Sequence, residues 1–235
     1  MAAALAVYQT SVGKKFVMAI TGLIGYLFVI VHMIGNLKVF LGPQAFNEYS
    51  EFLRTVGEPA LPARTLLWII RLVLLASVIL HVVAAVQLSR QSQVGRPIGY
   101  RQKKRVQANF ASMTMRWGGV AIFLFIIYHL LHFTFGVVHP DFRELNDNGI
   151  VHPEAYHNLV IGFQNPLVVL FYLLAVAALG MHLYHGVWSL FQTLGVNRPQ
   201  WNGLFRALAV ASGVLLFLGF AIVPVAVLFG MVQVA

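Results

Sequence analysis

The chain has 235 residues, of which 59% are hydrophobic and 10% are charged, and its formal net charge is +9. A water-soluble domain of this length needs far more polar surface, so the composition excludes a soluble protein and indicates an integral membrane protein. The chain contains no cysteine, which excludes disulfides, cysteine-bound iron–sulfur clusters and covalently attached c-type haem.

Five apolar stretches are long enough to cross a bilayer, which takes roughly 20 residues. In chain order they cover about 16–40, 65–89, 117–138, 166–191 and 206–231. The first follows two lysines, but it is too long for the core of a signal peptide, so we expect it to remain in the protein. The fourth opens with Asn165 and Pro166, which suit a helix cap and first turn. We predict an all-α bundle of five transmembrane helices, forming a single domain over residues 1–235.

The charges are distributed unevenly between the two sides of such a bundle. With the N-terminus inside, all seven acidic residues fall outside, together with only five basic ones. The other basic residues fall inside: Lys14, Lys15, Arg90, Arg96, Arg101, Lys103, Lys104, Arg105, Arg116, Arg198 and Arg206. Because cytoplasmic segments carry the excess of lysine and arginine, we predict a cytoplasmic N-terminus and an external C-terminus. The net charge therefore reflects topology and lipid contact, not nucleic-acid binding.

Histidine is the other unusual feature of the spans. Of nine histidines, His139, His152 and His157 fall in an outer loop, where we expect ordinary loop residues. The remaining six lie within the first four spans: His32, His81, His129, His132, His182 and His185. Ionisable groups are costly in a bilayer and usually mark function, so this set predicts a functional site.

The depths of these histidines divide them into two layers. At a rise of about 1.5 Å per residue, His32 lies roughly 7 Å to the outside of the midplane, with His129 and His132 roughly 3 and 7 Å on the same side. His81 and His182 lie roughly 6 Å to the inside, and His185 roughly 10 Å. Facing helices thus offer imidazoles at matched depth, the first span with the third and the second with the fourth.

Paired imidazoles without further ligands favour haem over a bare metal ion. Zinc takes about four protein ligands, and neither layer has a cysteine or a nearby carboxylate to complete such a set. Haem supplies four nitrogens itself and needs only two more. We therefore predict two non-covalent b haems, each held by two histidines. The alternative is a haem-free protein, such as a transporter, in which the histidines carry protons.

Several segments resemble one family, the diheme cytochrome b subunit of succinate dehydrogenase and fumarate reductase, in its single-chain five-helix form. The matching segments are SVGKKFVMAITG (11–22), FVIVHMIGN (28–36), ILHVVAAVQ (79–87), GGVAIFLFIIYHLLHF (118–133) and MHLYHGVWS (181–189). Together with the order of the spans, the resemblance covers nearly the whole chain. Its most specific part is the set of four histidines in the right helices, with HxxHGxWS closing the fourth span.

The resemblance implies a ligand set. It assigns His32 and His129 to an outer, distal haem and His81 with His182 to an inner, proximal haem. His132 and His185 occupy positions that need not be histidine in the family. Depth alone leaves His132 as a possible partner of His32, so the choice of His129 comes from the resemblance.

The resemblance also implies a place in a complex. A flavoprotein subunit carrying FAD and an iron–sulfur subunit would dock on the cytoplasmic face of this multi-pass protein in a prokaryotic cytoplasmic membrane. Electrons from succinate would pass through both haems to a quinone, for which the diheme form favours menaquinone. The chain alone would have no activity. A cytochrome b subunit of a hydrogenase or formate dehydrogenase is the alternative within electron transfer.

Polar residues near the two interfaces are candidates for the haem propionates and the quinone. On the inner side these are Ser11, Lys14 and Lys15, with His185 as a further polar contact. On the outer side they are Asn36, Lys38, Arg71 and His132. Two carboxylates, Glu51 and Glu58, could exchange protons with a quinone bound near the outer haem. For Arg71, contact with lipid headgroups is an equal alternative.

Overall fold

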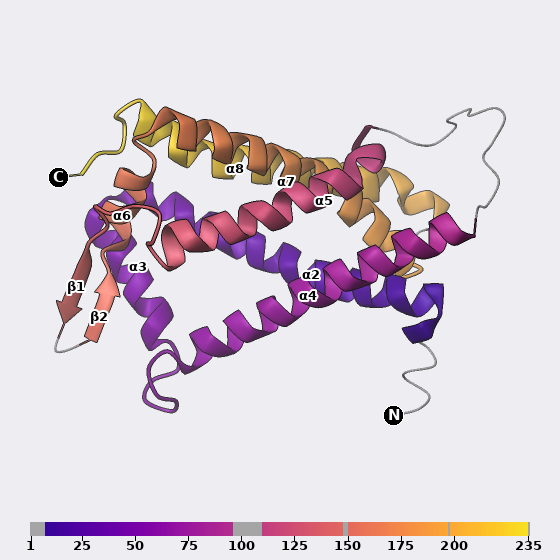
Figure 1. The fold of residues 1–235 in the computed structure, drawn as a ribbon, viewed down its shortest axis with the longest axis horizontal. Helices are drawn as coiled ribbons and strands as arrows, with labels where there is room; N and C mark the ends of the chain where they lie inside the picture. Colours follow the sequence, from indigo (N-terminus) through magenta and orange to yellow (C-terminus); the bar gives the residue numbers. More distant parts are fainter. Residues whose placement is uncertain (1–7, 96–109, 148–149, 197, 235) are drawn as a thin grey trace.

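Five long helices dominate the computed structural model, which describes residues 8–95, 110–147, 150–196 and 198–234. They are α2 (Ser11–Leu37), α4 (Thr65–Val94), α5 (Phe110–His129), α7 (Pro166–Thr193) and α8 (Asn202–Leu228). Each is long and apolar enough to cross a membrane, which confirms the predicted all-α, five-span architecture. The described chain begins and ends at opposite ends of the bundle (Figure 1). Most of the basic loop between α4 and α5, residues 96–109, lies outside the described residues.

Four of the five helices begin or end several residues from the positions expected from hydropathy. α2 begins at Ser11, earlier than predicted, because the Thr10 side chain accepts a hydrogen bond from the Gly13 amide and caps the first turn. The third span is displaced from the predicted 117–138: α5 begins at Phe110, and after His129 it passes into a single π-helical segment, residues 130–134, where the helix stops. α4 continues to Val94, and α8 begins at Asn202 and stops at Leu228.

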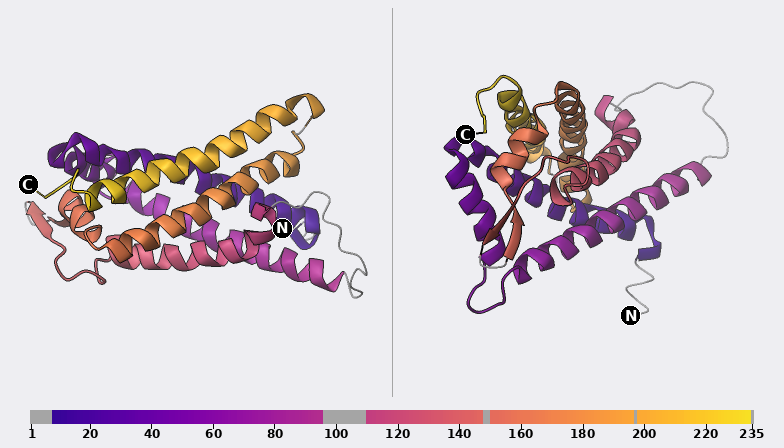
Figure 2. Two further views of the ribbon diagram at one scale, coloured as in Figure 1. Left: turned by 90° about the horizontal axis from the view of Figure 1, so that it is seen from above. Right: turned by 60° about the vertical axis from the view of Figure 1, so that its left-hand side comes forward.

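Close packing between α7 and α8 depends on two facing glycines. A Cβ placed on Gly180 would lie 2.9 Å from the Gly213 carbonyl oxygen, and one placed on Gly213 would lie 2.7 Å from the Gly180 oxygen. Only glycine therefore permits this approach, as at many membrane helix crossings. α2 packs on α4 and on α8, and α5 packs on α7 (Figure 2). Within the described residues, α4 and α7 do not pack closely, and neither do α2 and α5.

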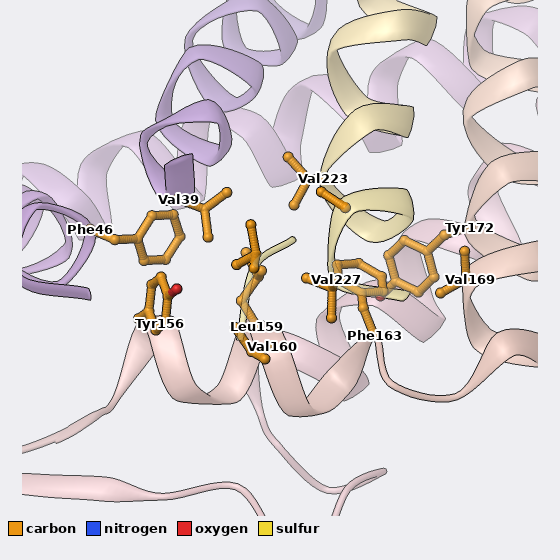
Figure 3. Packing of buried hydrophobic residues seen from close by; sticks show 12 residues of the cluster. Val39, Phe46, Tyr156, Leu159, Val160, Phe163, Val169, Tyr172, Val223 and Val227 are labelled. Carbon is orange, nitrogen blue, oxygen red and sulfur yellow. The ribbon is translucent and has the colours of Figure 1, made fainter. Parts of the chain in front are cut away.

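The segments between the spans build a cap at one end of the bundle, which we call the α3–α6 end. It contains the 3-10 turn Lys38–Leu41, α3 (Pro43–Thr55), the antiparallel strands β1 (Glu144–Asp147) and β2 (Ile150–Pro153), and α6 (Ala155–Gly162). Hydrophobic residues of these segments and of the adjoining ends of α7 and α8 form a buried cluster (Figure 3). All seven acidic residues fall in α3, in β1 or in the connections next to the segments of this cap, whereas Lys14 and Lys15 lie in the first turn of α2, and Arg198 and Arg206 lie just before α8 and near its start.

Candidate functional site

His81 of α4 and His182 of α7 face one another across the bundle, with ring centroids 6.2 Å apart and planes 58° to each other. The Nδ1 atom of His81 lies 3.1 Å from the Met18 carbonyl oxygen and 3.2 Å from Thr21 Oγ1. Thr21 donates its own proton to Val17 O at 2.7 Å, so its oxygen accepts from His81. His81 is therefore protonated on Nδ1, which leaves the Nε2 lone pair for a ligand.

His32 of α2 and His129 of α5 form a second pair, with centroids 5.8 Å apart and planes 82° to each other. Phe28 stacks on the His32 ring at 5.3 Å. The Asn36 amide donates to the His32 carbonyl oxygen at 2.8 Å and reinforces the helix beside it. Among the described histidines, His129 is the one whose ring contacts His32.

The two pairs lie at different levels of the bundle. His81 contacts α2 at Thr21, eleven residues before His32, which corresponds to about 16 Å along the helix axis. Along α7, Tyr172 lies beside His129, ten residues before His182, or about 15 Å. The predicted two-layer arrangement of the imidazoles is thus present, with His32 and His129 nearer the α3–α6 end.

The separation within each pair suits two ligands of one metal. A nitrogen–metal bond of about 2 Å on each side places the centroids of two opposed imidazoles about 6 Å apart. Within the described residues, no three histidine or carboxylate side chains converge to hold a metal ion, so each pair provides only two ligands. The donor set fits a group that supplies its remaining ligands itself, as haem does.

Glycines lie beside the His81–His182 pair. A Cβ on Gly22 of α2 would lie 3.2 Å from His81 Cε1, whereas one on Gly118 of α5 would meet nothing within 4 Å. A small pocket beside Gly118 is lined by Thr114, Met115, Gly118, Ala178, Met181 and His182. The His182 Nδ1 atom is buried and has no hydrogen-bond partner in the described residues. These features leave a small space beside the His182 ring and an unpaired nitrogen on that ring.

Tyr172 of α7 connects two histidines near the outer pair. Its hydroxyl lies 2.9 Å from His132 Nδ1 and 3.4 Å from His129 Nδ1. Both Tyr172 and His132 are buried. The sequence pattern assigned no polar contact to Tyr172, so the sequence-based interpretation missed this role. Thr21 was missed as well: a hydroxyl about two turns after Lys14 and Lys15 stands out in an apolar helix, but the sequence does not show what it contacts.

The predicted propionate contacts are only partly oriented towards the interior. Ser11 and Lys15 are exposed, and Lys14 is buried with its Nζ donating to Gln9 O at 3.3 Å. Lys38 lies over the Tyr49 ring, 5.1 Å from its centroid. No contact of these lysines with a paired imidazole is recorded in the described residues, and their roles stay predictions.

Arg71 is exposed and lies 5.1 Å from the centroid of the Trp68 ring, an arrangement that suits the headgroup region. Glu51 and Glu58 are exposed at the α3–α6 end. Burial lowers the pKa of Arg54 below its usual value, and the nearby Glu51 carboxylate partly offsets this. The role of both carboxylates in proton exchange with a quinone stays a prediction.

The remaining histidines differ in burial. His185 is half-buried, one turn after His182. His157 is buried in α6, and His139 stacks on Phe142 with centroids 5.0 Å apart. The sequence predicts ordinary loop residues at these positions, and the structure places His157 in a helix and packs both side chains into the cap. The side chain of His152 lies outside the described residues.

No family model, no curated protein and no solved structure matches the chain. The five long apolar helices establish a multi-pass helical membrane protein. Two pairs of histidines face one another within this bundle.

Proposed function

We propose that this protein is the membrane-anchor cytochrome b subunit of a succinate:quinone oxidoreductase. The observation that carries the proposal is the pair of centroid separations, 6.2 Å for His81 with His182 and 5.8 Å for His32 with His129. Each pair joins two helices that do not otherwise pack closely, so the imidazoles meet across the interior of the bundle. Two b haems, one for each pair, fit this donor set.

The chain itself would hold and orient the cofactors. Bound haem accepts and releases single electrons. His81, fixed by Met18 and Thr21, would present Nε2 to the inner haem, and His182 would complete the pair from α7. With two histidines holding each haem, the group would serve in electron transfer and would not bind oxygen or substrate. The apolar helices around each pair exclude water and make the potential depend strongly on the few polar groups nearby.

The arrangement of the pairs supports passage of electrons along the bundle axis. If the N-terminal end is cytoplasmic, as the positive-inside rule predicts, the inner pair lies nearer the docking face for an iron–sulfur subunit and its FAD-containing partner. The outer pair lies nearer the α3–α6 end, where we place reduction of a quinone, menaquinone in the simplest version of the proposal. Electrons from succinate would then cross most of the membrane within this chain.

The test is purification of the intact complex from its native membrane in mild detergent. We expect flavin, iron–sulfur clusters and a b-type spectrum in one particle, with succinate reducing the haem. Haem with hydrogenase or formate dehydrogenase subunits in place of the flavoprotein would overturn the assignment to succinate. A colourless preparation that retains all its soluble partners would overturn the haem-binding role as well.

A further inference from the structure

The hydroxyl of Tyr172 lies between two histidine nitrogens, at 2.9 Å from His132 Nδ1 and 3.4 Å from His129 Nδ1. The hydroxyl has one proton to donate, and its oxygen can also accept. Tyr172 is 5% exposed and His132 is 1% exposed, so water does not compete for these groups. Buried polar groups are costly when unpaired, which favours the arrangement that satisfies all three.

The two distances indicate the direction of each bond. The shorter contact takes the hydroxyl proton, so His132 accepts at Nδ1 and carries its own proton on Nε2. The longer contact is then a bond from His129 Nδ1–H to the tyrosine oxygen. A neutral imidazole with its proton on Nδ1 has its lone pair on Nε2, which is the form that binds a metal.

We propose that Tyr172 is a positioning residue for the outer haem site: it holds His129 in its ligating tautomer, and His132 orients the tyrosine hydroxyl. This inference rests on the proposed function, because it takes His129 to be a haem ligand. In this arrangement His132 is a hydrogen-bond acceptor. It is no longer an alternative to His129 as the haem ligand opposite His32.

Aromatic packing keeps the hydroxyl between its two partners. The Phe163 ring lies edge-on to Tyr172 at 4.8 Å and 88°, and both belong to the cluster at the α3–α6 end (Figure 3). Phe133 stacks on His132, with centroids 4.1 Å apart. At the inner site, His81 Nδ1 donates to the Met18 carbonyl and to Thr21 instead. Loss of the Tyr172 hydroxyl would therefore affect the outer site and leave the inner site unchanged.

The test is a Tyr172→Phe variant of the intact complex, with each haem followed by redox titration and low-temperature spectroscopy. Without its acceptor His129 becomes a poorer electron donor to iron, so we expect the potential of the outer haem to rise. We also expect roughly 10- to 100-fold weaker retention of that haem, the usual cost of losing such a partner. The inner haem should be unaffected.

Tyr26→Phe is the matched control. Its hydroxyl lies 2.7 Å from Ser212 Oγ, so the same change removes a buried hydrogen bond that involves no histidine. An unchanged outer potential in Tyr172→Phe, or a shift equal to that of the control, would overturn the inference. If the wild-type complex contains two haems and Tyr172→Phe changes neither, this inference fails alone. If the wild type contains no haem, the proposed function fails.

Two variants of His132 test the orienting role. Asparagine places an oxygen near the position of Nδ1, so His132→Asn should retain most of the wild-type potential. His132→Leu removes the acceptor and should shift the outer haem as Tyr172→Phe does. Because these residues act in one hydrogen-bonded unit, the double variant Tyr172→Phe/His132→Leu should shift it little further. Two results would contradict the orienting role of His132. One is an equal shift of the outer-haem potential in His132→Asn and His132→Leu. The other is a shift in the double variant equal to the sum of the two single shifts.

Discussion

Replacement of Thr21 by valine tests how the inner histidine pair is held. Valine keeps the shape of threonine but removes the oxygen that lies 3.2 Å from His81 Nδ1, while the Met18 carbonyl at 3.1 Å remains. A single neutral hydrogen bond contributes about 0.5–1.5 kcal/mol. The expected loss is therefore about twofold to tenfold in haem retention at the inner site, well short of complete loss.

The assay is the haem content of the purified complex during washing with a competing haem-binding protein, combined with redox titration of both haems. The inner haem should dissociate faster and its potential should rise, while the outer haem stays as in the wild type. Ser212→Ala is the control, since Ser212 makes the same type of bond to its own helix, to Leu208 O at 2.7 Å, without a histidine partner. Equal effects of Thr21→Val and Ser212→Ala on the inner haem would refute the reasoning.

Glycine positions give two further predictions. Gly213→Val should lower the free energy of unfolding by about 1–3 kcal/mol, because its side chain would meet the Gly180 carbonyl oxygen. Thermal unfolding in detergent measures this, with Gly203→Ala as the control in open space, and equal midpoints would contradict the packing. Gly162→Ala places a Cβ 2.9 Å from Phe133 Cε1, so it should alter the spectrum of the outer haem and leave the inner one unchanged. The reverse pattern would contradict the placement of the outer site.

The spans were predictable because a bilayer imposes a simple requirement on them. Every backbone polar group must be satisfied within the segment, so a long apolar run becomes a helix. The ends of those helices were not predictable to the residue, because they depend on local events such as the Thr10 cap and the π-helical turn after His129. A hydropathy profile detects neither the cap nor the π-helical turn.

The cap at the α3–α6 end was not foreseen. Its helices and hairpin are short and only moderately apolar, and they are stabilised mainly by contacts between segments distant in sequence. Phe46 of α3 packs on Tyr156 of α6, with ring centroids 6.2 Å apart, and the Tyr156 amide donates to Asn47 Oδ1 at 2.9 Å. Such contacts cannot be read from local periodicity.

The two layers of histidines were foreseen because depth in a membrane follows directly from position along a helix, whereas the choice of His129 over His132 as the partner of His32 came from the family resemblance. The groups around them were not foreseen, because their role depends on rotation about the helix axis as well as depth. Tyr172 and Thr21 each face an imidazole, yet in the sequence they resemble other polar residues of the spans. Their contacts became evident only from the three-dimensional arrangement of α2, α4, α5 and α7.

The most direct test of the account is the ratio of haem to protein in the purified complex, measured with the reduced-minus-oxidised spectrum. We predict two b haems per chain in the wild type. The ratio should fall to one in each of the four single variants. His81→Ala and His182→Ala should lose the same haem, and His32→Ala and His129→Ala should both lose the other one. A wild-type complex without haem, or the loss of different haems from two members of one pair, would contradict the central claim.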